Sequence, residues 1–238
     1  THKILYDLGL PTTTQRIAYK QEEAIQQAKK VGFPVVLKPL DGNHGRGVSI
    51  NLTSDEQVIV AFKEAQSQST NRATIVENYV TGLDHRMLVV NGELVAVSKR
   101  VPGHVFGDGE KTIEELVEIV NRDPRRGIGH EKVLTRLKFD DQAERLLSEA
   151  GKNHETVLAK DEIFYLCSAG NLSMGGTAID MTDVVHPDNR EMAVRAIKSI
   201  GLDVGGVDFL TDDITQSYKD IGGAIVEVNA APGFRMHV

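Results

Sequence analysis

Two carboxylates and an amide near the end of the 238-residue chain have the types and spacing of a hard-cation site. Asp208 lies inside an apolar stretch typical of a strand, and Glu227 and Asn229 stand two residues apart at the end of another. Residues i and i+2 of a strand point to the same face, so these side chains can converge. Their oxygens suit Mg²⁺, which often keeps a substrate's phosphates among its ligands. Two solvated strand-end acids are the alternative, which the following Pro232-Gly233 turn, carrying Arg235, disfavours.

A lysine followed by a glycine-rich segment has the composition of a phosphate-binding loop. Lys38 ends the apolar run 35–39, and three glycines fall within 41–47, beside the donors His44 and Arg46. Glycine amides can turn towards an anion without side-chain obstruction. The segment is not a P-loop, because no Gly-Lys-Ser/Thr follows and a strand is expected next. A flexible hairpin turn with a strand-end lysine remains the open alternative.

A third set of residues could bind a nucleoside. The segment 77–80 begins with Glu77 at the end of an apolar strand, and Asp84 follows seven residues after that acid. Backbone groups at the strand end would read the adenine edge, and a carboxylate would bind the ribose hydroxyls. Taken alone this is a weak pattern, since acids at strand ends are usually only solvated.

Composition excludes several other classes of protein. The chain carries 27 Lys and Arg against 34 Asp and Glu, giving a formal net charge of −7, which argues against a general nucleic-acid coat. Its single cysteine, Cys167, excludes a disulfide framework and fits a reducing cytoplasm. No apolar run approaches the roughly 20 residues of a membrane helix, and no paired His or Cys spacing suggests zinc. The sequence therefore predicts a globular domain with neither nucleic-acid nor membrane partners.

The elements that must position these residues follow from hydrophobic periodicity and caps. Helices are expected over 22–31 (closed by Gly32), from Ser54 and from Thr112 (with Gln57 and Glu115 completing capping boxes), and over 189–200 (ended by Gly201). Strands are expected at 35–39, 48–52, 74–77, 86–90, 94–99, 206–210 and 224–228, with Asn91-Gly92 as a hairpin turn. The mixed order of helices and strands predicts an α+β fold.

Taken in order, these motifs resemble the ATP-grasp fold: strand lysine, glycine loop, acidic adenine hinge, ribose acid, then Asp … Glu-x-Asn ahead of Pro-Gly. More narrowly, the chain resembles the ATP-grasp domain of the cyanophycin synthetases. The closer match is carried by segments 41–48, 82–86, 107–109, 121–127, 129–131, 171–173, 175–177, 183–187 and 227–237. The resemblance implies two α+β lobes that grip ATP between them, with approximate boundaries 1–100 (nucleotide) and 161–238 (metal) and a helical insertion over 101–160.

The resemblance also implies roles, residue by residue. For the nucleotide they are Lys38, Gly42, His44, Gly45, Arg46 and Gly47 at the phosphates, Glu77, Asn78 and Val80 at the adenine, and Asp84 at the ribose. The implied Mg²⁺ ligands are Asp208, Glu227 and Asn229. Arg86, Arg100 and Arg235 are candidate catalytic groups for substrate carboxylates and an acyl phosphate. Candidate substrate-binding residues are His104, Asn171, Ser173, Gly175 and Gly176.

The activity implied is that of an ATP-dependent carboxylate–amine ligase. The terminal carboxylate of a poly-aspartate chain would attack the γ-phosphate of ATP, and the amine of an incoming aspartate would then displace phosphate to form a peptide bond. Expected partners are the acidic polymer, aspartate, the remaining domains of a larger synthetase and further copies in a homo-oligomer. A dipeptide-polymerising or glutathione-synthetase-like ligase stays open, as does a non-catalytic nucleotide-binding module.

Overall fold

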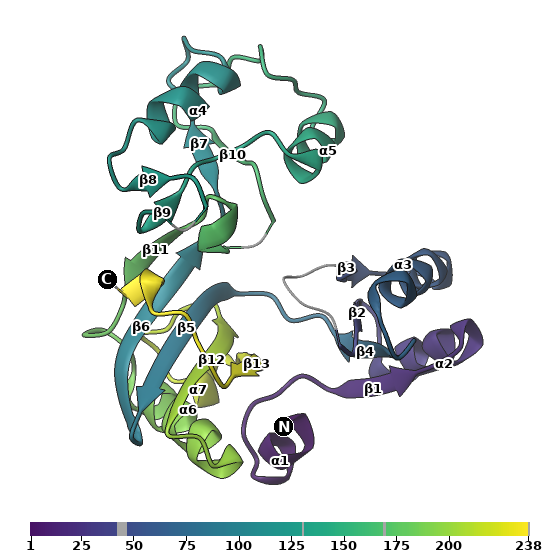
Figure 1. The fold of residues 1–238 in the computed structure, drawn as a ribbon. Helices are drawn as coiled ribbons and strands as arrows, with labels where there is room; N and C mark the ends of the chain where they lie inside the picture. The colour runs from purple at the N-terminus through teal and green to yellow at the C-terminus, as the bar shows by residue number, and fades with distance from the viewer. Residues whose placement is uncertain (42–46, 130, 169, 238) are drawn as a thin grey trace. The chain divides into compact units, whose positions relative to one another are not determined.

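A computed structural model describes residues 1–41, 47–129, 131–168 and 170–237, which divide into two compact units (Figure 1). Unit 1 comprises Thr1–Gly82 with Gly222–Val226, and unit 2 comprises Leu83–Ile221 with Glu227–Val238. Both units combine helices with antiparallel strand pairs, so the predicted α+β class is confirmed. The lobe boundaries expected near residues 100 and 160 stay a prediction.

Unit 1 is a four-stranded sheet with two packed helices. The strands are β1 (Gln15–Ala18), β2 (Val35–Pro39), β3 (Ser49–Leu52) and β4 (Thr74–Asn78), in the order β1-β4-β2-β3. The packed helices are α2 (Gln21–Val31) and α3 (Asp55–Gln68), and the short helix α1 (His2–Asp7) precedes β1. Ala28 of α2 and Phe62 of α3 are buried in one apolar cluster with Leu37 and Val76 of the sheet. On β2, Leu37 and Pro39 are buried and Lys38 between them is half-buried, so its side chain lies on the face opposite to theirs.

The helix caps explain where two of the helices begin. Ser54 accepts a hydrogen bond from the Gln57 amide, as predicted, but the Gln57 side chain accepts from Thr53 N at 2.7 Å. The predicted capping box is therefore only half formed, because the chain enters the helix with the Thr53 amide nearer to Gln57. By contrast, Thr112 and Glu115 form the complete reciprocal box at the start of a helix in unit 2.

A five-stranded sheet forms the centre of unit 2. It contains β5 (Leu83–Val90), β6 (Glu93–Val101), β11 (Thr177–Asp180), β12 (Val204–Thr211) and β13 (Ala224–Asn229), in the order β11-β6-β5-β12-β13; the first three residues of β13 are counted in unit 1. Helix α6 (Pro187–Ile200) packs on β5, β6 and β12, and the short helix α7 (Tyr218–Ile221) precedes β13. The hairpin between β5 and β6 turns at Asn91 (φ 50°) and Gly92 (φ 79°), which confirms the turn predicted from that dipeptide.

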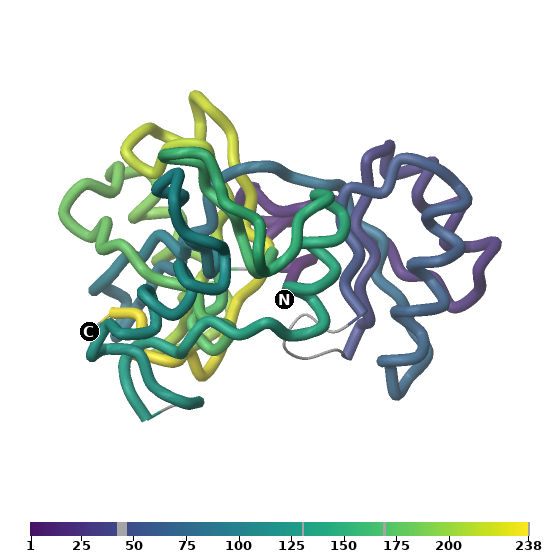
Figure 2. The backbone as a smooth tube through the Cα atoms, turned by 90° about the horizontal axis from the view of Figure 1, so that it is seen from above, coloured from purple at the N-terminus to yellow at the C-terminus, as the bar shows by residue number. Residues whose placement is uncertain are grey.

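Residues 104–166 of unit 2 have an apolar core of their own. This segment holds β7 (His104–Phe106), α4 (Ile113–Asn121), β8 (Arg126–Gly127), β9 (Leu134–Thr135), α5 (Asp141–Glu149) and β10 (Ile163–Tyr165). Ile113, Leu147 and Leu158 are fully or almost fully buried in its cluster. Figure 2 follows the same chain, teal to green, from a second direction. The turns η1 (Leu172–Met174) and η2 (Arg235–His237) complete the elements, and no helix in the described ranges is long and apolar enough to cross a membrane.

Candidate functional site

The carboxylate of Glu77 in unit 1 is buried and fully satisfied. Glu77 is 5% exposed on β4, the strand that pairs with both β1 and β2. Lys38 Nζ donates to Oε1 at 2.8 Å, while Gln15 Nε2 (2.7 Å) and Thr13 Oγ1 (3.1 Å) donate to Oε2. Such donors are needed because an unpaired ion costs several kcal/mol in a protein interior. The structure therefore brings together Lys38 and Glu77, which the sequence placed in separate parts of a nucleotide site, and the Lys38 side chain stays 23% exposed.

The strand end beyond Glu77 offers backbone groups. The Asn78 side chain accepts from Thr14 N at 2.6 Å, and the Asn78 amide donates to Thr14 O, so this residue holds the strand end in place. Val80 is half-buried, and neither its N–H nor its C=O bonds to another described backbone group. An exposed amide and carbonyl at a strand end can pair with the edge of a base.

The glycine loop is described only at its end. Gly42, His44, Gly45 and Arg46 lie outside the described residues, so their expected phosphate contacts stay a prediction. Gly47 adopts φ 69°, the left-handed region that glycine enters without strain.

Two acids and two arginines form a network on one face of the unit 2 sheet. The strand registers place Asp84 opposite Arg100 and Arg86 opposite Asp208 on β5, β6 and β12. Arg100 Nη2 donates to Asp84 Oδ1 (2.6 Å) and to Asp208 Oδ2 (3.0 Å). Arg86 bonds Asp208 through Nε and through Nη2, the latter at 3.0 Å. The charges alternate, so the four groups neutralise one another away from water.

Burial sets the electrostatics of this network. Asp208 is 4% exposed, and burial raises the pKa of Asp84, with Arg100 acting in the opposite direction. Burial would lower the pKa of Arg100, but the neighbouring Asp208 and Asp84 carboxylates raise it. Arg100 therefore remains a cation, and any metal ion that bound Asp208 would compete with two guanidinium groups for its oxygens.

The remaining predicted metal ligands lie on β13. Glu227 is exposed, and its side chain makes no hydrogen bond or ion pair with another described residue. Asn229 shares its face of the strand, and its Nδ2 is buried without a partner. An uncommitted carboxylate and an amide oxygen fit a Mg²⁺ ion in their chemistry, and the unpaired Nδ2 would be satisfied by a phosphate oxygen. Within the described ranges no three His, Cys, Asp or Glu side chains group around a possible ion, and the predicted set itself has only two carboxylates.

The substrate-binding candidates fall at separate places in unit 2. Asn171, Ser173, Gly175 and Gly176 form one turn around η1, in which the Asn171 carbonyl accepts from Gly176 N at 3.1 Å. A Cβ on Gly176 would lie 2.9 Å from the Asn171 and Val101 carbonyl oxygens, so this turn requires glycine. Ser173 is exposed at its surface.

The remaining substrate-binding candidate, His104, and the catalytic candidate Arg235 both have structural partners. His104 lies outside the 171–176 turn. Its Nδ1 lies 2.8 Å from Pro102 O, and its ring packs edge-on against Phe106. Arg235 donates to Thr135 Oγ1 (2.7 Å) and to Gly129 O (3.3 Å), so it ties the last turn of the chain to β9.

The sequence did not point to several residues that contact the Glu77 carboxylate in unit 1 or the candidate site residues of unit 2. Thr13 and Gln15 share the Glu77 carboxylate, and the only signal for them is a pair of polar residues two apart beside a short extended segment. Arg126 donates to Gly175 O (3.0 Å) from within the Arg-rich stretch that had been assigned to the insertion as a whole. Ser98, opposite Arg86 on β6, bonds Met236 O and His237 Nδ1, each at 2.9 Å.

Comparison with known proteins identifies what this chain resembles. The family model of the prokaryotic glutathione synthetase ATP-grasp domain matches residues 5–112. The cyanophycin synthetase of Crocosphaera subtropica is 51% identical over 241 aligned residues, which cover 100% of this chain and 27% of that protein. The bifunctional glutathione biosynthesis protein of Clostridium perfringens is 34% identical, over 92% of this chain and 29% of its own length.

A solved structure gives the same result for the fold. The bifunctional glutathione synthetase from Pasteurella multocida superposes with a TM-score of 0.70 at 30% identity, covering 100% of this chain and 33% of that one. The chain thus spans less than a third of the length of the cyanophycin synthetases that it matches. The expected ATP-grasp fold is confirmed by the family model and by this superposition.

Proposed function

The chain belongs to the ATP-grasp family, and from that premise we propose that it is the ligase domain of a synthetase that extends a poly-aspartate chain. The observation that carries the proposal is the acid–arginine network of Asp84, Arg86, Arg100 and Asp208 in a chain 51% identical throughout to a cyanophycin synthetase. Such a network supplies both a carboxylate for a metal and guanidinium groups for an anionic substrate.

The residues of unit 1 have the chemistry to bind the nucleotide. Lys38 and the 42–47 loop would hold its phosphates, and Glu77 with the open backbone of Val80 would receive the adenine. Lys38 can bind a phosphate without leaving the Glu77 carboxylate unpaired, because Gln15 and Thr13 continue to donate to that carboxylate. Asp84, although paired with Arg100, remains the candidate for the ribose hydroxyls.

Mg²⁺ would be held by Glu227 and Asn229 on β13, with Asp208 as the third ligand. When bound, the ion neutralises charge on the nucleotide phosphates, which is the main requirement of phosphoryl transfer. Asp208 becomes available when Arg86 or Arg100 turns towards a substrate anion, so the two arginines exchange one carboxylate partner for another. This exchange conserves the number of charge-assisted hydrogen bonds.

The reaction needs positioning more than it needs a nucleophilic side chain. A terminal carboxylate oxygen of the polymer bonds to the γ-phosphorus, and the bond to the β–γ bridging oxygen breaks to release ADP. The amine of aspartate then bonds to the acyl carbon, loses a proton, and expels inorganic phosphate. Arg86, Arg100 and Arg235 would stabilise the charge on the acyl phosphate while the turn 171–176 holds the substrate. The same proposal includes a cytoplasmic location, further domains and assembly into homo-oligomers.

A glutathione-synthetase-like activity is the second candidate, because that family's model matches residues 5–112. It differs from the first candidate in the carboxylate that is phosphorylated, which belongs to a dipeptide, and in the amine substrate, which is glycine. The higher identity to cyanophycin synthetases along the whole chain favours the polymer. A nucleotide-binding module without catalysis is disfavoured by the retention of Asp208, Glu227 and Asn229.

ADP release in a coupled assay tests the proposal. With Mg²⁺ and ATP we expect turnover that requires both aspartate and a poly-aspartate or cyanophycin primer, and none with γ-glutamylcysteine and glycine. Glu227→Gln should abolish turnover because it removes a metal ligand, whereas the matched exposed variant Glu64→Gln should keep it. Turnover that ignores the primer, or that survives Glu227→Gln, would contradict the proposal.

A further inference from the structure

His237, at the end of the short turn η2 in unit 2, has a ring nitrogen without a partner. Its Nε2 is buried and makes no hydrogen bond within the part of the chain that the structure describes. Polar atoms in a protein interior nearly always have a partner, so each exception calls for an explanation, and a catalytic role is one.

The hydrogen bonds of Ser98 determine which nitrogen of His237 carries the proton. Ser98 Oγ donates to Met236 O at 2.9 Å, and it also lies 2.9 Å from His237 Nδ1. A hydroxyl has one proton and two lone pairs, so Oγ must accept from the Nδ1–H group. Since only one nitrogen of the neutral ring is protonated, Nε2 carries a lone pair that no described donor uses.

The ring of His237 lies on the same side of the unit 2 sheet as the acid–arginine network. Ser98 on β6 is directly opposite Arg86 on β5, and directly opposed residues of antiparallel strands share a face. Arg235 begins the turn that His237 ends. The free nitrogen thus belongs to a residue placed near two of the arginines proposed to stabilise the acyl phosphate.

Burial and two neighbouring charges set the protonation of His237. Burial lowers its pKa, and the positive charge of Arg86 on β5 lowers it further, whereas Asp180 on β11 acts in the opposite direction. The ring is therefore neutral at pH 7. Asp180 would stabilise the imidazolium that forms when Nε2 takes up a proton, so the site has the properties of a general base.

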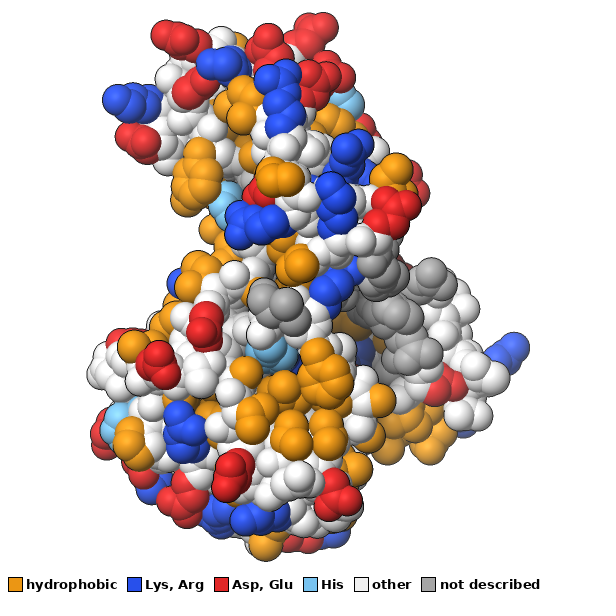
Figure 3. Space-filling view, turned by 60° about the vertical axis from the view of Figure 1, so that its left-hand side comes forward, with side chains coloured by type: hydrophobic (Ala, Val, Ile, Leu, Met, Phe, Trp, Pro, Cys, Tyr) orange, Lys and Arg blue, Asp and Glu red, His pale blue; other side chains and the backbone are white. Residues whose placement is uncertain are grey.

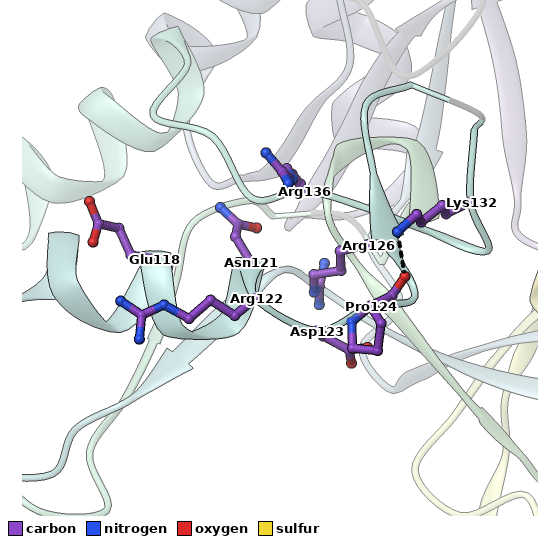
Figure 4. Close-up of a pocket in the computed structure, with 8 residues that line it drawn as sticks. All are labelled: Glu118, Asn121, Arg122, Asp123, Pro124, Arg126, Lys132 and Arg136. Atoms are coloured by element: carbon purple, nitrogen blue, oxygen red, sulfur yellow. Dashed lines mark hydrogen bonds between the residues drawn. The ribbon is translucent and has the colours of Figure 1, made fainter.

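A basic cavity beside the end of α4 differs from this group because acids compensate its cations (Figure 4). Its volume is about 430 Å³, and Figure 3 shows Lys and Arg side chains gathered over this part of unit 2. Burial lowers the pKa of Arg126 in the lining, but Asp123, also in the lining, raises it. The unpaired nitrogen of His237 is therefore the clearer sign of a missing ligand.

We propose that His237 Nε2 takes a proton from the ammonium group of the incoming amino acid, and that Ser98 positions the ring for this step. The identity of that amino acid as aspartate rests on the proposed function. The ammonium gives one proton to Nε2 and becomes a neutral amine, whose nitrogen bonds to the acyl carbon. The bond from that carbon to the phosphate oxygen breaks, and the departing phosphate takes a second proton from the nitrogen. The imidazolium returns its proton to water before the next addition.

An exchange of the nucleophile tests this inference. Aspartate is an ammonium ion at pH 7 and needs a base, whereas hydroxylamine is mostly neutral at that pH and attacks an acyl phosphate without one, giving a hydroxamate. His237→Asn keeps an amide that can bond to Ser98 and removes Nε2. With Mg²⁺, ATP and primer, it should lower aspartate-dependent ADP release about 100-fold or more and change hydroxylamine-dependent release by less than about threefold.

The pH profile separates the loss of a base from a loss of structure. Below the pKa of an amine, its neutral fraction rises about tenfold for each pH unit. The deficit of His237→Asn relative to the wild type should therefore shrink between pH 7 and pH 9. Ser98→Ala, which keeps the ring but no longer fixes its tautomer, should show a smaller loss with aspartate alone. The matched control His154→Asn, which replaces a histidine paired with Glu144, should leave both rates unchanged.

The outcomes for His237→Asn are distinct from those for the proposed function. Equal losses with both nucleophiles would overturn the inference, and so would aspartate-dependent release that stays at the wild-type rate. A wild-type protein that releases no ADP with the primer and either nucleophile would remove the proposed function. The comparison would then be repeated with γ-glutamylcysteine as the carboxylate and with glycine against hydroxylamine, and it would decide the role of His237 in the same way.

Discussion

The two units bury a carboxylate in different ways. Glu77 in unit 1 is shared by one cation, Lys38, and two neutral donors, Gln15 and Thr13. Among the described residues, the Asp208 carboxylate in unit 2 accepts only from guanidinium groups, and the network adds a second acid, Asp84. Neutral donors can keep donating to the buried Glu77 carboxylate when the cation turns to a ligand. In the unit 2 network, by contrast, each buried charge is stabilised by its neighbours of opposite charge. We therefore expect unit 1 to tolerate the loss of a charge and unit 2 not to.

The largest effect is expected for Asp208→Ala. This substitution leaves Arg86 without its partner and Arg100 with Asp84 alone, both largely buried. Breaking a buried pair in this way costs about 3–5 kcal/mol of unfolding free energy. Urea unfolding measures it, and the exposed Asp212→Ala, one residue beyond β12, should stay within about 0.5 kcal/mol of the wild type. Similar small losses for both variants would remove the distinction between the units.

The second largest effect is a pH dependence in unit 2. His85 is 0% exposed, on the face of β5 opposite to Asp84, and burial lowers its pKa to about 4. The unfolded chain takes up this proton near pH 6.5 and the folded chain only near 4, so stability is complete at pH 7 and falls as the pH drops through that window. The loss between pH 7 and 5 is about 2 kcal/mol.

His85→Gln removes the titrating group and isolates its share of that slope. Chemical unfolding of the wild type and the variant at pH 7, 6 and 5 gives the comparison. We expect a shallower slope for the variant. Identical slopes would mean that His85 protonates alike in both states and that the pH response comes from other groups.

A smaller effect is expected for Glu77→Gln in unit 1. The glutamine oxygen can still accept from Gln15 and Thr13, and only the charged contact to Lys38 is lost. We expect a loss of about 1–2 kcal/mol by urea unfolding. A loss of unfolding free energy equal to that of Asp208→Ala would show that the neutral donors do not stabilise the side chain at position 77 once the ion pair is lost.

The smallest effects concern the helix caps of the two units. Thr112 completes its reciprocal box with Glu115, whereas the cap at Ser54 is limited to the bond from the Gln57 amide and lacks the reciprocal bond. Thr112→Ala should cost about 1 kcal/mol and Ser54→Ala about 0.5 kcal/mol. Thermal unfolding of both variants, with Ser67→Ala as a non-capping serine control, ranks them; the reverse order would contradict the observed cap geometry.

Local signals in the sequence predicted most of the elements. Helix α6 ends at Gly201 in the left-handed conformation, and Asn91-Gly92 forms the hairpin turn, because both depend on backbone preferences of single residues. The start of β5 was predicted three residues late, at Arg86 instead of Leu83. Asp84 and His85 are polar and occur in turns as readily as in strands. They belong to β5 because they pair with β12.

The candidate site could be predicted as residue types but not as contacts. Asp208 pairs with Arg86 across 122 positions of sequence, and the register of β5 and β12 decides that pairing. Likewise, Arg126 reaches Gly175 because the segment 104–166 folds around its own core, and no local pattern contains that information. Residues 42–46 of the glycine loop lie outside the described residues, and their role stays a prediction.

The central claim is that a carboxylate is activated as an acyl phosphate, and oxygen transfer tests it most directly. A poly-aspartate primer labelled with ¹⁸O in its terminal carboxylate is incubated with the protein, Mg²⁺, ATP and aspartate, and the released phosphate is analysed by mass spectrometry. With the primer in excess over ATP, so that each primer is extended at most once, we predict that each released phosphate carries one oxygen from the primer carboxylate. Unlabelled phosphate released in this first addition would contradict the account.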